Sequence, residues 1–364
     1  MVEYEEHFIE TDADLLAFLD RLHNEGVTRC SVDTEADSLH SYREKLCLIQ
    51  MSCDNMLAII DPLRIEQEAL QKLVTFWDEA DEVWMHGADF DMTLLQRTFD
   101  FVPARILDTQ LAARLAGHTR FGLANLIADY FDIHLSKSSQ KADWGARPLK
   151  DKLLRYAFDD VRYLLPLADK LTEKVKGLSR HDWFTEWCHV SRDNVLARKE
   201  RSPDEIWRIP GWGKLDRSGL VFLRELWFWR DEESQSRDCP PFRVMSNQSL
   251  LDFSERSARG DNLRGAKGLN ASQAKRFRAA IEKARQVPKD EWPVKRIRKG
   301  GRREEFNADE YERLRAHRDA KAAELNLEPT IIATRGILET MANYPEKQDE
   351  MLMKWQRGIL FGDE

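Results

Sequence analysis

The stretch YAFDD, residues 156 to 160, lies in a strongly helical run and sets a tyrosine and two aspartates on a helix that must bury one face. With about 100° per residue and Ala157 at zero, Asp160 lies at roughly −60° and Tyr156 at roughly −100°. Both flank the buried face, whereas Asp159, at roughly −160°, faces water. The apolar residues of that face are Leu154, Val161, Leu164, Leu165 and Ala168. A carboxylate and a phenol beside a buried face need a partner, and a cation is the obvious one.

Three further acids follow strand-like runs elsewhere in the chain. Asp33 and Glu35 in SVDTEAD are two residues apart, so they project from the same face of a strand. Asp91 in HGADFDM lies in the first turn of a predicted helix. Each pattern alone has an ordinary explanation, because strand ends are commonly solvated and an acid favours a helix N-terminus.

The order and spacing of these residues resemble a known family. Asp33-x-Glu35, Asp91 five residues after His86, and Tyr156-x-x-x-Asp160 resemble the three motifs of the DEDD exonuclease superfamily, tyrosine subclass. ILDTQ at 106–110, DWGARPL at 143–149 and YAFDDVRYLLP at 156–166 are similar to the ribonuclease D family, in the expected order. The last third resembles two HRDC domains (helicase and RNase D C-terminal). The resemblance covers nearly the whole chain.

The resemblance implies a fold and a reaction. The expected fold class is α/β, an RNase H-like exonuclease domain (a mixed sheet flanked by helices) followed by two small all-α HRDC-like domains. The implied activity is that of a metal-dependent 3′–5′ exoribonuclease that releases 5′-nucleotides. Its catalytic residues are Asp33, Glu35, Asp91, Tyr156 and Asp160. The four acids would bind two Mg²⁺ or Mn²⁺ ions, which prefer oxygen ligands, and Tyr156 would orient the attacking water.

The resemblance also implies the partners. The substrate is expected to be the 3′ end of structured RNA such as tRNA precursors, with no organic cofactor and a monomeric enzyme. Trp144 and Arg147 precede the catalytic helix, where stacking on a base and gripping a phosphate are reasonable roles; the alternative is that Trp144 only anchors its loop. His86 at a strand end is predicted to be structural rather than catalytic.

Residue patterns divide the chain into parts. Residues 1–177 read as one α/β domain: a helix from Thr11 to Gly26, then three strand-like runs (VTRCSVDTEA, KLCLIQMSC and MLAIIDP) that suggest a meander, then EVWMHGA and alternating helices. Residues 178–219 are interpreted as a connector, followed by a helical module at 220–290, a basic linker at 291–307 and a second module at 308–364.

An internal repeat supports the two modules. Arg230-Asp231 matches Arg318-Asp319, Val244 matches Ile332 and Leu250 matches Leu338, all at an offset of 88 residues. The linker between the modules concentrates cations. They are Lys295, Arg296, Arg298, Lys299, Arg302 and Arg303. These are predicted to contact phosphate; a solvated tether is the alternative.

Composition excludes other classes of protein. The chain has 364 residues, of which 42% are hydrophobic and 33% charged, and no apolar run approaches the roughly 20 residues of a membrane helix. The acidic start, MVEYEEHFIE, does not resemble a signal peptide, so the cytoplasm is expected. Five cysteines without metal-ligand spacing are interpreted as reduced packing residues. The net charge of −8 argues only mildly against a nucleic-acid partner, because the cations are clustered.

Two alternative functions remain open on the sequence alone. One is a DNA exonuclease with the same chemistry, as found beside some RecQ-type helicases, although the HRDC pair and the missing helicase motifs favour RNA. The other is a catalytically silent RNA-binding scaffold. The complete set of four acids counts against a silent site.

Overall fold

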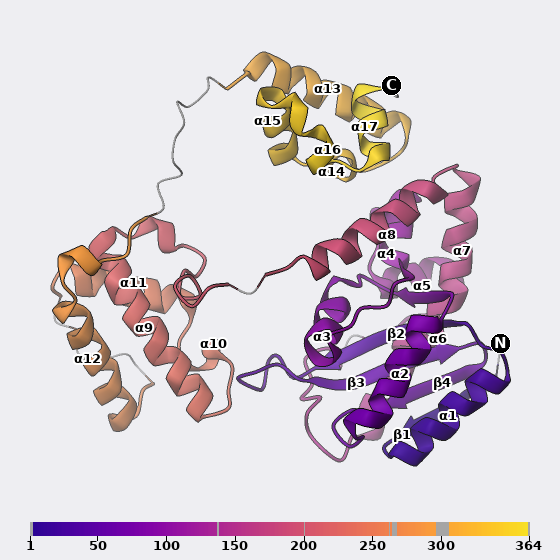
Figure 1. Cartoon of the computed structure of the whole chain (residues 1–364), viewed down its shortest axis with the longest axis horizontal. Coiled ribbons are helices and arrows are strands. Elements are labelled where there is room, and N and C mark those ends of the chain that lie inside the picture. The colour runs from indigo at the N-terminus through magenta and orange to yellow at the C-terminus, as the bar shows by residue number, and fades with distance from the viewer. Residues whose placement is uncertain are drawn as a thin grey trace. The chain divides into compact units, whose positions relative to one another are not determined.

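The computed structural model describes residues 3–136, 138–199, 201–261, 263, 268–295 and 306–362. These residues form two compact units (Figure 1). The first unit comprises Met1–Ala36, Leu46–Arg198 and Arg303–Glu364, and the second comprises Asp37–Lys45 and Lys199–Arg302. In this described part of the chain, no helix has both the length and the apolarity that crossing a bilayer requires.

A six-stranded mixed sheet forms the centre of the first unit (Figure 1). Its order is β1 (Glu5–Ile9), β4 (Met56–Ile60), β3 (Leu46–Cys53), β2 (Arg29–Ala36), β5 (Glu82–Met85) and β6 (Ile106–Asp108). Only β3 runs antiparallel to its two neighbours, and the other neighbouring pairs are parallel. The predicted meander of β2, β3 and β4 is therefore confirmed. Strand β1 was not predicted, because its partner β4 lies about 50 residues away in the chain.

Helices cover both faces of this sheet. Its helices are α1 (Asp12–Asn24), α2 (Gln67–Glu79), α3 (Asp89–Phe99), α4 (Thr109–Leu115), α5 (Leu123–Phe131), α6 (Asp151–Arg162), α7 (Leu164–Gly177) and α8 (His181–Leu196). Apolar residues of α1, α2 and α3 pack against Val32 and Met51 on one face. On the other face α6 packs against Leu48 and Ile59. Alternate residues of β2 and β3 thus point into different layers.

The first unit extends beyond its predicted end at residue 177. Helix α8 lies within the segment interpreted as a connector, and its Phe184 and Cys188 are buried in one cluster with Leu171 of α7. The interpretation of residues 178–198 as a connector was therefore wrong. The apolar spacing of residues 184, 188 and 195 is that of a helix with one buried face. All five cysteines are free and buried, as predicted.

The second unit contains the first helical module. Its helices are α9 (Arg217–Ser236), α10 (Pro241–Val244), α11 (Asn247–Ala258) and α12 (Ala271–Gln286). The module has its own core, in which Trp229 and Phe277 meet edge to face with ring centroids 4.9 Å apart. Residues 37–45, which join β2 to β3 along the chain, belong to this unit, and the Tyr42 hydroxyl donates to Asp231 at 2.9 Å. The predicted module at 220–290 thus corresponds to a compact helical body.

The second helical module belongs to the first unit. Its helices are α13 (Ala308–Glu324), α14 (Pro329–Ile332), α15 (Arg335–Asn343), α16 (Gln348–Met351) and α17 (Lys354–Phe361). Trp355 of α17 stacks on Trp183 of α8, with centroids 5.0 Å apart and rings inclined by 13°. The Arg180 guanidinium donates to the Leu325 carbonyl at 2.6 Å. This module therefore shares a core with α7 and α8.

Candidate active site

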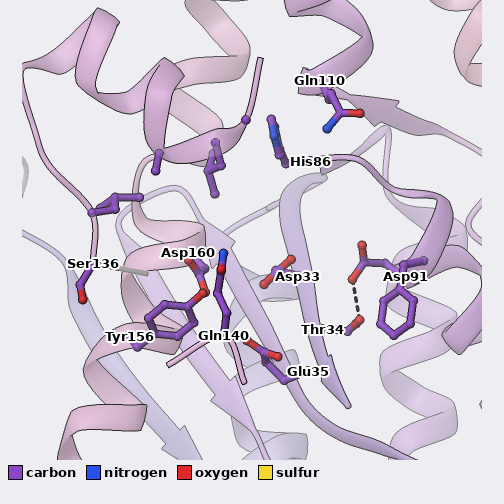
Figure 2. A pocket seen from close by; sticks show the side chains of 15 residues that line it. Asp33, Thr34, Glu35, His86, Asp91, Gln110, Ser136, Gln140, Tyr156 and Asp160 are labelled. Atoms are coloured by element: carbon purple, nitrogen blue, oxygen red, sulfur yellow. Dashed lines mark hydrogen bonds between the residues drawn. The ribbon is translucent and has the colours of Figure 1, made fainter. Parts of the chain in front are cut away.

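A cavity of about 490 Å³ in the first unit collects all five predicted catalytic residues. Strand β2 supplies Asp33 and Glu35, helix α3 supplies Asp91, and helix α6 supplies Tyr156 and Asp160 (Figure 2). Its lining is completed by Thr34, His86, Phe90, Gln110, Gly122, Leu123, Ala124, Leu135, Ser136 and Gln140. None of these lining residues is a lysine or arginine, so no described cation balances the acids within the cavity.

Three of the four acids form a tight cluster. Carboxylate oxygens of Asp33, Glu35 and Asp160 all lie within 4.8 Å of one another. Asp33 and Glu35 share a face of β2 because they are two residues apart, and α6 packs against that face of the sheet. Tyr156 and Asp160, one turn apart, flank the buried face of α6, as the helical angles predicted. The cluster provides the oxygen ligands that a hard divalent cation prefers.

Asp91 lies in the same cavity but is held separately. Its side chain is only 5% exposed, and its carboxylate accepts a hydrogen bond from the Thr34 hydroxyl at 2.5 Å (Figure 2). Because Thr34 lies between Asp33 and Glu35 on β2, this bond ties α3 to the strand that carries two other acids. Sequence reasoning missed Thr34, although its place inside the DTE motif marks it.

Burial of like charges strongly perturbs the acids. Burial, followed by repulsion from Asp160, raises the pKa of Asp33 to about 8. Burial, followed by repulsion from Asp33, Asp160 and Asp91, raises the pKa of Glu35 to about 9. Burial raises the pKa of Asp160 to about 7, although a hydrogen bond from Tyr156 opposes the shift. Without a cation the cluster therefore retains protons near neutral pH, and a divalent ion would replace them.

Tyr156 is suited to hydrogen bonding rather than to proton abstraction. Burial, followed by the negative charge of Asp160, raises the pKa of its hydroxyl above the ordinary value. The phenol consequently stays protonated, and it donates to the Asp160 carboxylate. Its ring contacts the Trp144 ring with centroids 5.9 Å apart. This contact fixes the plane of the tyrosine beside the acid cluster.

The predicted substrate contacts of Trp144 and Arg147 are not supported. Trp144 is 1% exposed and packs in the core beneath α6, so it anchors its loop instead of stacking on a base. Arg147 makes two hydrogen bonds to the buried Asp61 carboxylate, at 2.5 and 2.8 Å. Its remaining donors bond the carbonyls of Trp144, Ala146 and Cys47. No donor of Arg147 is left for a phosphate.

The basic linker is largely beyond what the structure describes. Arg296, Arg298, Lys299, Arg302 and Arg303 lie outside the described residues. Lys295 is described, and its ammonium group donates to the Gly213 carbonyl at 2.9 Å within the second unit. Phosphate contact by the linker stays a prediction.

His86 lines the cavity, and its predicted structural role stays a prediction. Its Nδ1 lies 2.9 Å from the Thr109 hydroxyl, which donates to the Met85 carbonyl at 3.0 Å. Burial lowers the pKa of the imidazole, which favours its neutral form. Sequence reasoning missed Gln140, whose side chain points into the cavity beside Tyr156 and Asp160 (Figure 2). The sequence feature that could have identified Gln140 is its position three residues before the DWGARPL motif.

Comparisons with known proteins agree with this geometry. Residues 7–176 match a family model described as a 3′–5′ exonuclease, and residues 219–284 match the HRDC domain. Ribonuclease D of Gluconacetobacter diazotrophicus is 29% identical over 364 residues, covering 98% of this chain and 91% of that protein. Ribonuclease D of Zymomonas mobilis is 30% identical over 281 residues, covering 74% of this chain and 70% of that protein. The chain belongs to the ribonuclease D family.

Membership in the ribonuclease D family confirms the predicted fold class and the predicted enzyme class, a 3′–5′ exoribonuclease of the ribonuclease D type. The crystal structure of Escherichia coli RNase D superposes with a TM-score of 0.71, covering 99% of this chain and 96% of that one at 23% identity. That likeness shows the shared fold. The HRDC match falls on the first helical module of this ribonuclease D-family chain.

Proposed function

We propose that this chain removes nucleotides one at a time from the 3′ end of structured RNA, such as tRNA precursors, by hydrolysis that uses two divalent metal ions, Mg²⁺ or Mn²⁺. The observation that carries the proposal is the cluster of Asp33, Glu35 and Asp160, whose oxygens lie within 4.8 Å of one another beside Tyr156. Asp91 adds a fourth carboxylate in the same cavity. Partly buried acids without a described counter-ion in the cavity fit a site that is completed by divalent cations.

The residues of the chain have distinct roles in the reaction. Asp33, Glu35, Asp91 and Asp160 would hold the ions, which supply an activated water and neutralise charge on the phosphate. The protonated Tyr156 hydroxyl donates to Asp160, so its oxygen can accept a hydrogen bond from the attacking water and orient it. The water oxygen then attacks phosphorus and loses its proton to solvent. The bond to the 3′ oxygen breaks, that oxygen takes up a proton, and a 5′-nucleotide leaves.

RNA is the substrate that the relatives favour. The curated relatives are named ribonuclease D, and the Escherichia coli enzyme is described as an exoribonuclease involved in structured RNA processing. We extend that preference to this chain, with the first helical module as a further RNA contact. The monomeric state and the cytoplasmic location stay predictions.

Digestion of matched substrates tests the proposal. RNA and DNA of one sequence, each labelled at the 5′ end, are incubated with Mg²⁺, Mn²⁺ or EDTA. We expect a ladder that shortens from the 3′ end of RNA with either metal and disappears in EDTA. Shortening of DNA alone would instead establish a DNA exonuclease, and RNA binding without cleavage under any metal would establish a scaffold.

A further inference from the structure

Gln50 of β3 lies directly opposite the metal-binding acid Asp33. The two residues are partners in the antiparallel ladder between β2 and β3, which are neighbours in the sheet (Figure 1). Directly opposite residues project from the same face with their Cβ atoms about 4.5–5.5 Å apart. The Gln50 side chain therefore lies beside that of Asp33, on the face that packs against α6.

The Gln50 amide is buried without a described partner. Gln50 is 0% exposed, and neither its Nε2 nor its Oε1 has a hydrogen bond within the described residues. Buried side-chain amides in folded proteins are nearly always hydrogen-bonded, so one with both ends unpaired needs an explanation. An apolar residue of similar size would fill this position at lower cost.

The next pair along the same face is also polar. Ser31 and Ser52 oppose each other in the ladder, are 0% exposed, and have hydroxyls without a partner among the described residues. On the opposite face of the same strands, Val32 and Met51 are apolar and pack in the core. Gln50, Ser31 and Ser52 thus form a row of buried polar side chains next to the acid cluster, on one face of β2 and β3. This set is called the polar row. The row points to a role for its polar groups at Asp33.

We propose that Gln50 is a positioning residue that orients the charged Asp33 carboxylate for metal binding, an inference that rests on the proposed function. With a metal bound, its Nε2 would donate a hydrogen bond to the Asp33 carboxylate, and its Oε1 would accept one from the Ser31 or Ser52 hydroxyl. A carboxylate ligand held by an outer hydrogen bond keeps its orientation, and loss of such a partner commonly weakens metal binding by about 10- to 100-fold. An ionised Asp33 carboxylate would accept the hydrogen bond from Gln50, and the polar row would then have hydrogen-bond partners.

The proposal predicts opposite changes in two measurements. Gln50→Met nearly preserves side-chain size but removes both amide groups, so the metal-free protein should be at least as stable as the wild type. Its affinity for metal should nevertheless fall by about tenfold. A residue with a purely structural role would change stability without changing metal affinity.

Titration calorimetry with Mn²⁺ in the absence of RNA, alongside thermal unfolding in EDTA, tests this proposal. Met51→Leu is the matched control, because it changes a buried side chain of the same strand on the face away from the acids, and its Mn²⁺ affinity should stay within about threefold of wild type. Wild-type Mn²⁺ affinity in Gln50→Met would overturn the role of Gln50 alone. If the wild type itself bound no Mn²⁺, the metal site and with it the inference would both be wrong.

Discussion

The two helical modules share one sequence repeat but have different surroundings. In the first, Arg230 donates to the Met245 carbonyl at 3.0 Å; in the second, Arg318 donates to the Ala333 carbonyl at 2.9 Å. Donors and acceptors are each 88 residues apart, which confirms the predicted repeat. Yet the first module has its own core, and the second is buried against α7 and α8.

The contacts that separate the two modules lie outside the repeated positions. Trp355 stacks on Trp183, and the backbone N–H of Lys354 donates to Glu186 at 2.8 Å. These contacts hold the second module against α8. The hydrogen bond from the repeated Arg318 to the Ala333 carbonyl, in contrast, lies within the module. A repeated sequence can thus give one local structure with two roles, a separate body and a part of the exonuclease unit.

The largest expected effect comes from removing one buried aromatic residue in each unit. Trp355→Ala and Phe277→Ala should each cost about 3–5 kcal/mol of unfolding free energy, because both rings are buried. Hydrogen exchange should show faster opening of α8 in Trp355→Ala and of α9 in Phe277→Ala. If Trp355→Ala left α8 as protected as in the wild type, the second module would not share its core.

Substitutions at two glycines test whether close packing at Gly117 constrains the docking of the second module. Gly117 has φ +85°, and a Cβ there would lie 2.9 Å from the Asn326 carbonyl of the second module. Gly26 has φ +70° with nothing near a Cβ, so Gly26→Ala reports backbone strain alone, about 1–2 kcal/mol. Thermal unfolding should show a greater loss in Gly117→Ala. Equal losses would mean that this contact does not constrain docking.

The two units should also differ in how their stability depends on pH. In EDTA, raised pKa values of about 8, 9 and 7 for Asp33, Glu35 and Asp160 mean that the folded first unit holds protons that the unfolded chain releases. Its stability should therefore fall as pH rises from 6 to 9, by up to ~1.4 kcal/mol per pH unit for each proton.

The second unit should behave differently over this range. Its buried Glu233 pairs with Arg276, which lowers the pKa of that carboxyl, so the stability that this pair contributes is lost only under acidic conditions. Hydrogen exchange of β3 and α9, corrected for the intrinsic exchange rate, separates the units. Mg²⁺ should restore protection of β3 at pH 9, and failure to do so would contradict a metal site at the acids.

Much of the site could be predicted because short-range geometry places its residues. A two-residue spacing on a strand brings Asp33 and Glu35 together, and helical angles place Tyr156 and Asp160 beside the buried face. The roles of Trp144 and Arg147 could not be predicted in this way. Arg147 is engaged by Asp61, 86 residues earlier in the chain, and such a long-range ion pair leaves no local pattern.

The fold likewise has parts that could be predicted from neighbouring residues and parts that depend on contacts between distant segments. Strands β2, β3 and β4 follow one another and pair as neighbours, so the chain order predicts them. Helix α8 was missed although residues 184, 188 and 195 have helical spacing. What the spacing does not contain is where Phe184 and Cys188 pack, because their cluster includes α7 and the second module, which lies more than 100 residues later. The second module's position depends on aromatic residues contributed by separate segments.

The most direct test of the central claim compares two adjacent aspartates on one helix. Asp160 lies in the acid cluster, whereas Asp159 contacts Arg162 at 3.4 Å outside the cavity. The measurement is the rate of 3′ shortening of 5′-labelled RNA with Mg²⁺ for Asp160→Asn and Asp159→Asn. We expect at least a ~100-fold loss for Asp160→Asn and less than a ~3-fold change for Asp159→Asn. Equal rates for the two variants would contradict the assignment of the active site.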